Sequence, residues 1–334
     1  MNIQASDTSI RKMDISGILN YAIYMICIAF IIMVAIRNKN FFTVSNFLLI
    51  LQQSSPFLIA STGMAFVLMS GGIDISVGQN MLLSAAVGAK MAQFLMSSGL
   101  AKPDTVLLLI ITIITSALVG SVIGCINGIT IAKFKIIPFI ATFAMTNIVR
   151  GIALVIMGGQ SQTLDGVTRT INTNIGGVFP LVLILAIVML LTFNFVSRSL
   201  PFGRKVKAIG RSADNAHKVG IKVVQTKIIV HTLCGAAVGV CGIIGASQMQ
   251  YVQSSFGTGN EFIIISGCIL GGVSLKGGKG SIIPGAVIGV ITVQMIVNGL
   301  IMINASPYIY TIARGVIIFM AIMIESIKYK GILK

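Results

Sequence analysis

The sequence predicts an all-α polytopic membrane protein with about ten transmembrane helices and both termini in the cytoplasm. Hydrophobic residues make up 55% of the 334 residues, and the mean hydropathy is +0.98. Charged residues make up only 10%, whereas a soluble domain contains about 25%. This charge deficit extends over the whole chain, in apolar runs close to the length of about 20 residues that a membrane span needs. A soluble domain with a single anchor is therefore excluded.

Ten apolar segments separated by short polar links are the predicted spans. Their approximate bounds are 17–36, 47–69, 76–97, 105–132, 136–157, 178–197, 228–249, 261–275, 281–304 and 308–326. The first segment follows Arg11 and Lys12 as a signal peptide would, but it has no small-residue cleavage site, so we interpret it as a retained span. The transmembrane domain is therefore 17–328, with cytoplasmic tails at 1–16 and 329–334.

Polar groups near the start of the second span suggest its environment. Gln52, Gln53, Ser54 and Ser55 follow one another there, and four polar side chains are costly against lipid. We expect this helix to face the interior of the bundle or a polar cavity.

The second and third spans are joined by a glycine-containing break at 70–80. Asp74 and Ser76 can each accept a hydrogen bond from the first turn of the following helix. Two interpretations stay open: Asp74 only caps that helix at the interface, or the break lines or gates a pathway, because irregular backbone at membrane depth persists only against protein or water. The pattern of 71–78 recurs at 271–278, which indicates either an ancient duplication or two similar tight turns.

The most basic part of the chain is the loop 198–227, which carries eight Lys or Arg and one acid, Asp214. Membrane proteins keep such loops in the cytoplasm. Six predicted spans precede this loop and four follow it, so both termini are expected to be cytoplasmic as well. Within the loop, 212–219 is predicted to be helical and to end on Gly220. Five predicted spans precede the Thr- and Asn-rich segment 158–177, so this segment is expected to lie outside.

Charge and cysteine usage exclude two classes of partner. The net charge of +16 would suggest nucleic-acid binding in a soluble protein, but here it lies in short loops, as orientation in a membrane requires. We therefore predict no nucleic-acid partner. The five cysteines lie within apolar runs and lack metal-ligand spacing, so we predict no metal site and no cofactor.

The sequence also lacks the motifs of an energy-converting enzyme. The phosphate-binding loop G-x-x-x-x-G-K-[ST] is absent, and no nucleophile is paired with a base, so an enzyme is not predicted. A proton-driven carrier usually places acids or histidines within its spans, whereas Asp74, His231, Glu261 and Glu325 lie close to predicted span ends. What remains is a transport channel driven by a partner that acts on the basic loop.

Four stretches of the sequence carry a family resemblance. They are GGIDISVG (71–78), NGITIAKFKIIPFIATFAMTNIVRG (127–151), FGRKVKAIGRSADNAHKVGIKV (202–223) and LGGVSLKGGKGSIIPGAVIG (270–289). In this order they resemble the permease subunit of monosaccharide ABC importers, the ribose/xylose/galactoside group. The resemblance implies a multi-pass protein of the bacterial plasma (inner) membrane that imports a pentose or hexose. The alternatives are another small solute, such as a signalling furanone or a nucleoside, and an ion-driven secondary carrier.

In that family the segment matching 203–222 is a coupling helix that packs into a cleft of a separate ATPase subunit. The residues to which the resemblance gives this role are Gly203, Arg204, Asp214, Asn215, Ala216, Gly220 and Ile221. The Glu-Ala-Ala sequence of related importers corresponds here to Asp-Asn-Ala, so the middle alanine has become asparagine.

The resemblance also implies the partners and a pathway. Two permeases, identical or paralogous, pair with two ATPase domains, and a periplasmic or lipid-anchored binding protein delivers the sugar from outside; membrane lipid is a further partner. The residues expected along the translocation pathway are Asp74, Ser76, Asn80, Asn147 and Asn298. The alternative is that polar residues within spans make ordinary interhelical hydrogen bonds.

Overall fold

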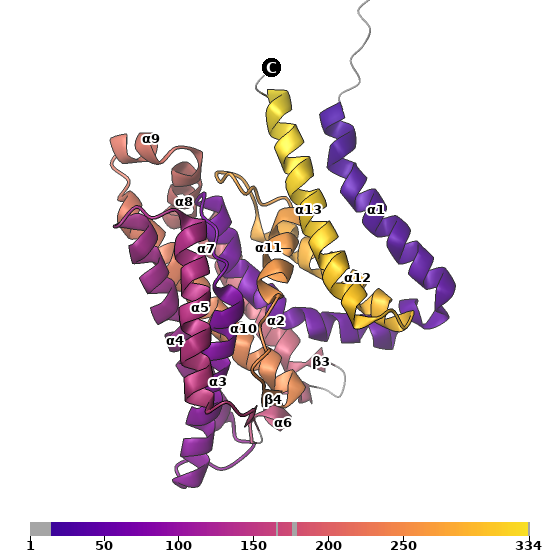
Figure 1. The fold of residues 1–334 in the computed structure, drawn as a ribbon, viewed down its shortest axis with the longest axis vertical. Helices are drawn as coiled ribbons and strands as arrows, with labels where there is room; N and C mark the ends of the chain where they lie inside the picture. Colours follow the sequence, from indigo (N-terminus) through magenta and orange to yellow (C-terminus); the bar gives the residue numbers. More distant parts are fainter. Residues whose placement is uncertain (1–14, 165, 176–178, 333–334) are drawn as a thin grey trace, which may run out of the picture.

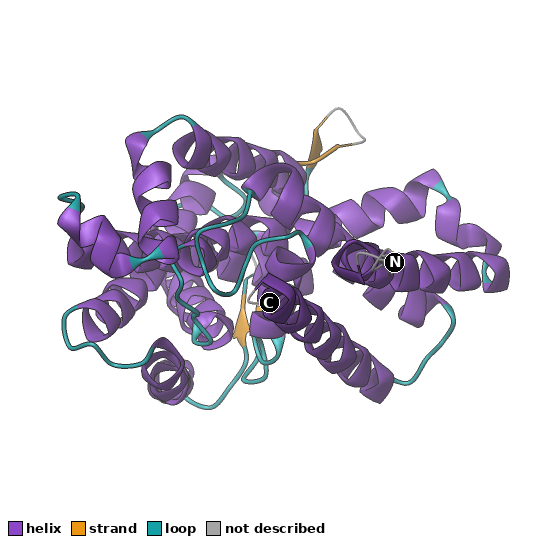
Figure 2. Ribbon diagram, turned by 90° about the horizontal axis from the view of Figure 1, so that it is seen from above, coloured by secondary structure: helices purple, strands orange, loops and turns teal. Residues whose placement is uncertain are grey.

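The computed structural model describes residues 15–164, 166–175 and 179–332, and this part of the chain is mainly helical (Figures 1 and 2). Each predicted span overlaps one long helix, although the bounds differ by several residues in places. The ten helices concerned, all within the described residues, are α1 (Ile15–Arg37), α2 (Val44–Met69), α3 (Val77–Ser97), α4 (Val106–Ala132), α5 (Pro138–Met157), α7 (Leu181–Arg198), α10 (Val223–Met249), α11 (Asn260–Leu270), α12 (Val287–Met302) and α13 (Pro307–Ile332). Most of the predicted tail 1–16 lies outside the described residues, and α13 continues into the predicted tail 329–334 as far as Ile332.

Short elements connect these helices. They are η1 (Lys39–Phe42), α6 (Thr168–Ile171), α8 (Pro201–Arg211), α9 (Ala213–Lys218), η2 (Ile282–Ala286), and the strands β1 (Gln162–Thr163), β2 (Asn174–Ile175), β3 (Phe179–Pro180) and β4 (Tyr251–Val252). Antiparallel pairing joins β1 to β4 and β2 to β3. The first pair connects the predicted outer segment 158–177 with the link between α10 and α11.

The helices differ in hydropathy. In the described part of the chain, five segments are long and apolar enough to span a membrane: α4, α5, α7, α10 and Ile282–Met302. The predicted spans at α2 and α3 do not reach that hydropathy. α2 contacts α7, α10, α11 and α12, and its Ser54, Ser61 and Thr62 are fully buried. A helix enclosed by other helices faces little lipid, so it tolerates hydroxyl groups, which here bond to carbonyls of the same helix. The prediction of a mainly helical protein with several helices long and apolar enough to span a membrane is confirmed.

α4 and α10 pack tightly along their length, and glycines permit the approach. A methyl group at Gly120 or Gly124 of α4 would overlap the carbonyl of Gly235 or His231 of α10. With Gly128, these α4 glycines recur every fourth residue, which is the spacing by which membrane helices bring their backbones together. The backbones of α4 and α10 are therefore in close contact along this face.

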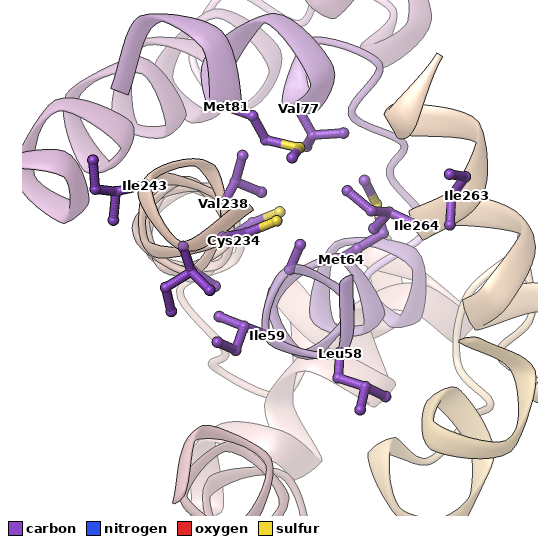
Figure 3. Packing of buried hydrophobic residues seen from close by; sticks show 14 of the residues in the cluster. Leu58, Ile59, Met64, Val77, Met81, Cys234, Val238, Ile243, Ile263 and Ile264 are labelled. Carbon is purple, nitrogen blue, oxygen red and sulfur yellow. The ribbon is translucent and has the colours of Figure 1, made fainter. Parts of the chain in front are cut away.

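The hydrophobic core lies where α2, α3, α10 and α11 meet (Figure 3). Met64, Met81, Cys234, Val238 and Ile264 come from these four helices, and each is at most 1% exposed. Cysteine behaves here as a small hydrophobe, and methionine fills irregular space between helices.

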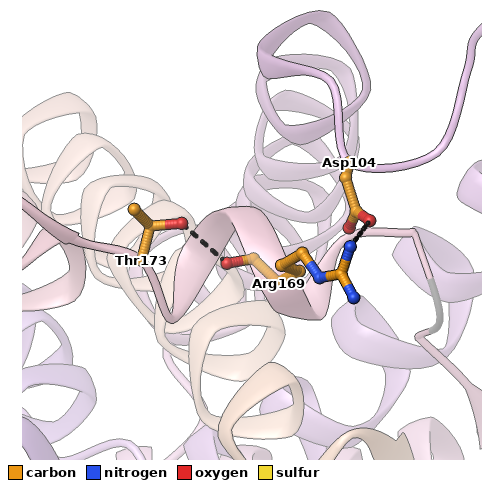
Figure 4. A network of polar contacts seen from close by, with 3 residues as sticks. All are labelled: Asp104, Arg169 and Thr173. Atoms are coloured by element: carbon orange, nitrogen blue, oxygen red, sulfur yellow. Dashed lines mark hydrogen bonds and ion pairs between the residues drawn. The ribbon is translucent and has the colours of Figure 1, made fainter.

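Different elements lie at the two ends of the molecule. Figure 1 shows the start of α1, the end of α13 and the α8–α9 segment at one end, with α6 and β4 at the other. Near α6, Arg169 forms an ion pair with Asp104 at 3.7 Å, and the Thr173 hydroxyl donates to the Arg169 carbonyl at 2.8 Å (Figure 4). The Arg169 side chain is 86% exposed, so this pair adds little stability.

Candidate functional site

α8 is an amphipathic helix that lies against the bundle. Val206 and Ile209 are buried, whereas Arg204 and other basic side chains of the helix are exposed. Gly203 lies so close to the Ser197 carbonyl, at the end of α7, that a side chain at this position would overlap it. α8 is thereby held to the transmembrane part while its basic face stays free.

α9 is bounded by two caps. The Ser212 hydroxyl accepts a hydrogen bond from the Asn215 backbone N–H at 3.2 Å. At the other end Gly220 adopts a left-handed φ of 82°, and the Ile221 N–H donates to the Ala216 carbonyl at 3.0 Å. The helix predicted over 212–219 is confirmed, and its caps explain its boundaries.

The surface of α9 is open to a partner. Asp214, Asn215 and Lys218 are exposed, and the apolar side chain of Val219 is 76% exposed. Ala216 is instead buried and packs inward. The α9 surface therefore combines charges of both signs with an accessible apolar group.

The end of α8 meets two glycine-rich loops. A methyl group at Gly210 would overlap the Met69 carbonyl at the end of α2 and lie against the Gly278 backbone N–H. That N–H itself donates to the Met69 carbonyl at 2.9 Å. Gly277 packs against Gly71 in the same place. The two loops with the repeated glycine pattern therefore touch each other and α8, and we call this contact the glycine junction (Met69, Gly71, Gly210, Gly277 and Gly278).

The break after α2 is held by a buried polar network. Asp74 is 2% exposed, and its Oδ1 accepts hydrogen bonds from the Ser76 N–H at 2.9 Å and the Ser76 hydroxyl at 2.6 Å. Asn127 of α4 donates from Nδ2 to Asp74 Oδ2 at 3.2 Å and to Ser76 Oγ at 2.8 Å. Ser76 was expected to cap α3, but its side chain makes no cap bond because the hydroxyl is committed to Asp74. Asp74 and Ser76 thus tie the break to α4.

The other three predicted pathway residues lie apart from this network. Asn80 is buried, and its Nδ2 donates to the Gly120 carbonyl at 3.4 Å. Asn298 exchanges two amide hydrogen bonds with Asn46, at 3.1 and 3.2 Å. Asn147 is exposed on α5. Two of the three therefore make interhelical hydrogen bonds.

A cavity of about 570 Å³ lies between α2, α10, α12, α13 and the segment that leads into α11. Five glutamines line it: Gln52, Gln53, Gln248, Gln253 and Gln294. The expectation that the first part of α2 faces a polar cavity is thus met for Gln52 and Gln53, whereas Ser54 and Ser55 are buried. None of the five predicted pathway residues lines this cavity.

Comparison with known proteins places the chain among permeases. A family model described as "branched-chain amino acid transport system / permease component" matches residues 46–323. The ribose import permease protein RbsC of Escherichia coli K12 is 33% identical, covering 90% of this chain and 92% of the relative. The chain belongs to this permease family.

Two further relatives share the permease architecture over similar lengths. The L-arabinose transport system permease protein AraH of Escherichia coli K12 is 33% identical over 93% of this chain and 92% of the relative. The galactose/methyl galactoside import permease protein MglC of Haemophilus influenzae is 30% identical over 92% and 94%. No solved structure matches. The resemblance to monosaccharide permeases that the motifs indicated is confirmed, and with it the expectation of a membrane permease.

Several residues of the permease cavity were missed from the sequence. Gln248 and Gln253 stand near a helix end and in a link, where polar residues are unremarkable. Arg314 lies within α13 and also lines the cavity. A basic residue inside an apolar span was a signal for a functional site that could have found it.

Proposed function

We propose that this permease is the transmembrane subunit of an ATP-binding-cassette importer that translocates a monosaccharide. One observation carries the proposal: permeases named for ribose, arabinose and galactose each match about nine-tenths of the chain. A pentose or hexose is therefore the favoured substrate class. ATP hydrolysis belongs to a separate ATPase subunit, and an external binding protein delivers the sugar.

The proposed topology has ten spans in the bacterial plasma (inner) membrane, with both termini in the cytoplasm. α11 is short, and α2 and α3 contain several buried polar residues. In this topology these three segments cross the membrane surrounded by other helices rather than by lipid. The gathering of the α1 start, the α13 end and the α8–α9 segment at one end of the molecule supports this orientation (Figure 1).

The α8–α9 segment is the proposed docking site for the ATPase, in an assembly of two permeases and two ATPase domains. Its exposed charges and the accessible Val219 support this role. At the opposite end, the β1–β4 pair joins segments 158–177 and 250–260, and this joined surface is the proposed contact for the binding protein.

The glycine junction is the proposed route by which the ATPase moves the bundle. A shift of α8 displaces Gly210, which touches both the end of α2 and the loop 271–280. Asp74 and Ser76 then carry the movement to α4 through Asn127. Partner binding thereby biases the bundle between outward-open and inward-open states, a population shift that needs only differential affinity.

Uptake into proteoliposomes tests the transport class. Vesicles contain the permease with its ATPase and binding protein, and the probes are labelled ribose, arabinose and galactose. We expect uptake of at least one probe that requires ATP and persists when ionophores collapse ion gradients. Uptake that is driven by an ion gradient in vesicles without the ATPase would instead establish a secondary carrier.

Co-purification tests the docking site. Asn215→Arg introduces a bulky cation on the exposed face of α9, and we expect it to lower the amount of ATPase recovered with the permease at least tenfold. Thr173→Arg makes the same change at an exposed position near α6, at the other end of the molecule, and should leave recovery unchanged. Equal recovery with both variants would show that α9 does not contact the ATPase.

A further inference from the structure

The cavity between α2, α10, α12 and α13 is an amide-lined space of a size that suits a small molecule. Its volume of about 570 Å³ falls within the usual range for ligand pockets, about 300–1,000 Å³. The segment between β4 and α11, which we assign to the outer side, forms one wall. The cavity is therefore positioned to receive a solute from outside. We propose that it is a transit site for one uncharged monosaccharide, an inference that rests on the proposed importer function.

Pro56 creates the geometry of the α2 wall. A proline has no N–H, so the carbonyl four residues earlier, that of Gln52, loses its helical partner. Gln248 of α10 replaces that partner, donating from Nε2 to the Gln52 carbonyl at 2.9 Å. Gln294 of α12 donates in the same way to the Gln53 carbonyl at 3.0 Å. Two side-chain amides from different helices are thus held on α2 carbonyls that lie just before Pro56.

These bonds leave hydrogen-bonding capacity free at the cavity. With their Nε2 atoms engaged, Gln248 and Gln294 keep Oε1 atoms that accept no hydrogen bond from any described residue. The side chains of Gln52 and Gln53 make no hydrogen bond within the described chain, so both of their amides can donate and accept. A sugar hydroxyl also donates and accepts hydrogen bonds, so it can pair with these free amide groups.

The charge around the cavity favours an uncharged ligand. Arg314 is the charged residue among those that line it, and its Nε has no partner among the described residues. Glu261 lies close enough to interact electrostatically with Arg314. With one guanidinium in its lining and an acidic residue nearby, the site has, among the described residues, no cluster of cations of the kind that would retain an acidic sugar.

Apolar residues complete the site. Phe57, Met81 and Phe256 line the cavity beside the amides. Such a surface can cover the C–H face of a sugar ring and remove it from water, while the glutamine amides hydrogen-bond to the hydroxyl groups at the ring edge. A transit site of this kind holds the sugar weakly enough to release it toward the cytoplasm.

Sugar protection in the isolated permease tests the site directly. A cysteine is placed at Gln53 (Gln53→Cys), and its reaction with a small maleimide is timed in detergent with and without high concentrations of ribose, arabinose or galactose. We expect at least one sugar to slow labelling twofold or more. Gln93→Cys on α3, outside the cavity, should label at the same rate with every sugar. Unchanged labelling at both positions would overturn the inference, and stronger protection by galacturonate than by galactose would overturn the uncharged class.

Uptake by the complete importer separates failure of this inference from failure of the proposed function. Gln53→Leu should lower sugar uptake at least tenfold while ATPase activity stimulated by the binding protein stays within twofold of wild type. Thr192→Val, at an exposed position of α7 outside the cavity, should leave both unchanged. If wild type lacks ATP-dependent uptake, the proposed function fails. If wild type transports but Gln53→Leu transports equally well, or loses uptake and stimulated ATPase together, only the cavity inference fails.

Discussion

Asp74 shows how one buried residue can hold an irregular segment in place. Its carboxylate accepts hydrogen bonds from the Ser76 N–H, the Ser76 hydroxyl and Asn127. An unpaired charge at this depth would be costly, so the network is what permits the break between α2 and α3. Asp74 therefore orders the residues before α3 and links them to α4, and its hydrogen bonds from its own segment come from Ser76 rather than from the first turn of α3. A place for this break along a translocation pathway stays a prediction.

Replacing Asp74 with asparagine should destabilise the permease. The Asn side chain substitutes an NH₂ group for one carboxylate oxygen, which leaves a buried donor without an acceptor and costs about 1–3 kcal/mol. The measurement is the thermal unfolding midpoint in detergent, which should fall. Asp104→Asn is the control, because its ion pair is exposed and contributes at most about 1 kcal/mol. An unchanged midpoint for Asp74→Asn would show that the network does not order the break.

At the scale of elements, prediction from the sequence succeeded where the local signal was strong. Long apolar runs identified the helices, and Ser212 and Gly220 marked the ends of α9. α11 ends at Leu270, five residues before the predicted end, because Gly271 and Gly272 follow and Gly272 has a φ of 84°. The resemblance implied one coupling helix over 203–222, whereas the structure has two helices, α8 and α9, divided at Ser212, whose backbone is extended. The local sequence signal predicted only the second of them.

The glycine junction leads to a prediction about α8. Alanine is favoured over glycine in helices by about 1 kcal/mol, yet Gly210→Ala adds a methyl group that overlaps the Met69 carbonyl. We expect this variant to retain its ATPase partner but to lose most sugar uptake, because α8 no longer fits against the end of α2. Gly151→Ala on α5, where a methyl group meets open space, should keep full uptake. Both quantities can be measured on the same purified complexes. Normal uptake by Gly210→Ala would exclude the junction as the route of coupling.

At the scale of the whole molecule, the sequence predicted only the α2 wall of the cavity, because the other walls come from segments far apart in the sequence. Gln52 was identified as one of four polar residues that are costly against lipid, but nothing in the sequence indicates that Gln248 donates to its backbone carbonyl. The contact between 71–78 and 271–278 could not be predicted for the same reason, because the two segments are far apart in the sequence. The repeated glycine pattern was visible, whereas the packing of both loops on Gly210 appears only in the folded chain.

Orientation in the membrane is the prediction that belongs to the whole chain. The proposed topology separates Lys205 on α8 from Gln160 in segment 158–177 by the full membrane, because six spans precede the first and five precede the second. Both residues are exposed, so a cysteine at either position is accessible to a reagent on its own side. In right-side-out vesicles an impermeant maleimide should label Gln160→Cys and spare Lys205→Cys, and inverted vesicles should give the opposite result. Labelling of both cysteines from one side would mean that the chain between Gln160 and Lys205, which contains α7, crosses the membrane an even number of times. The ten-span topology would then have to be abandoned.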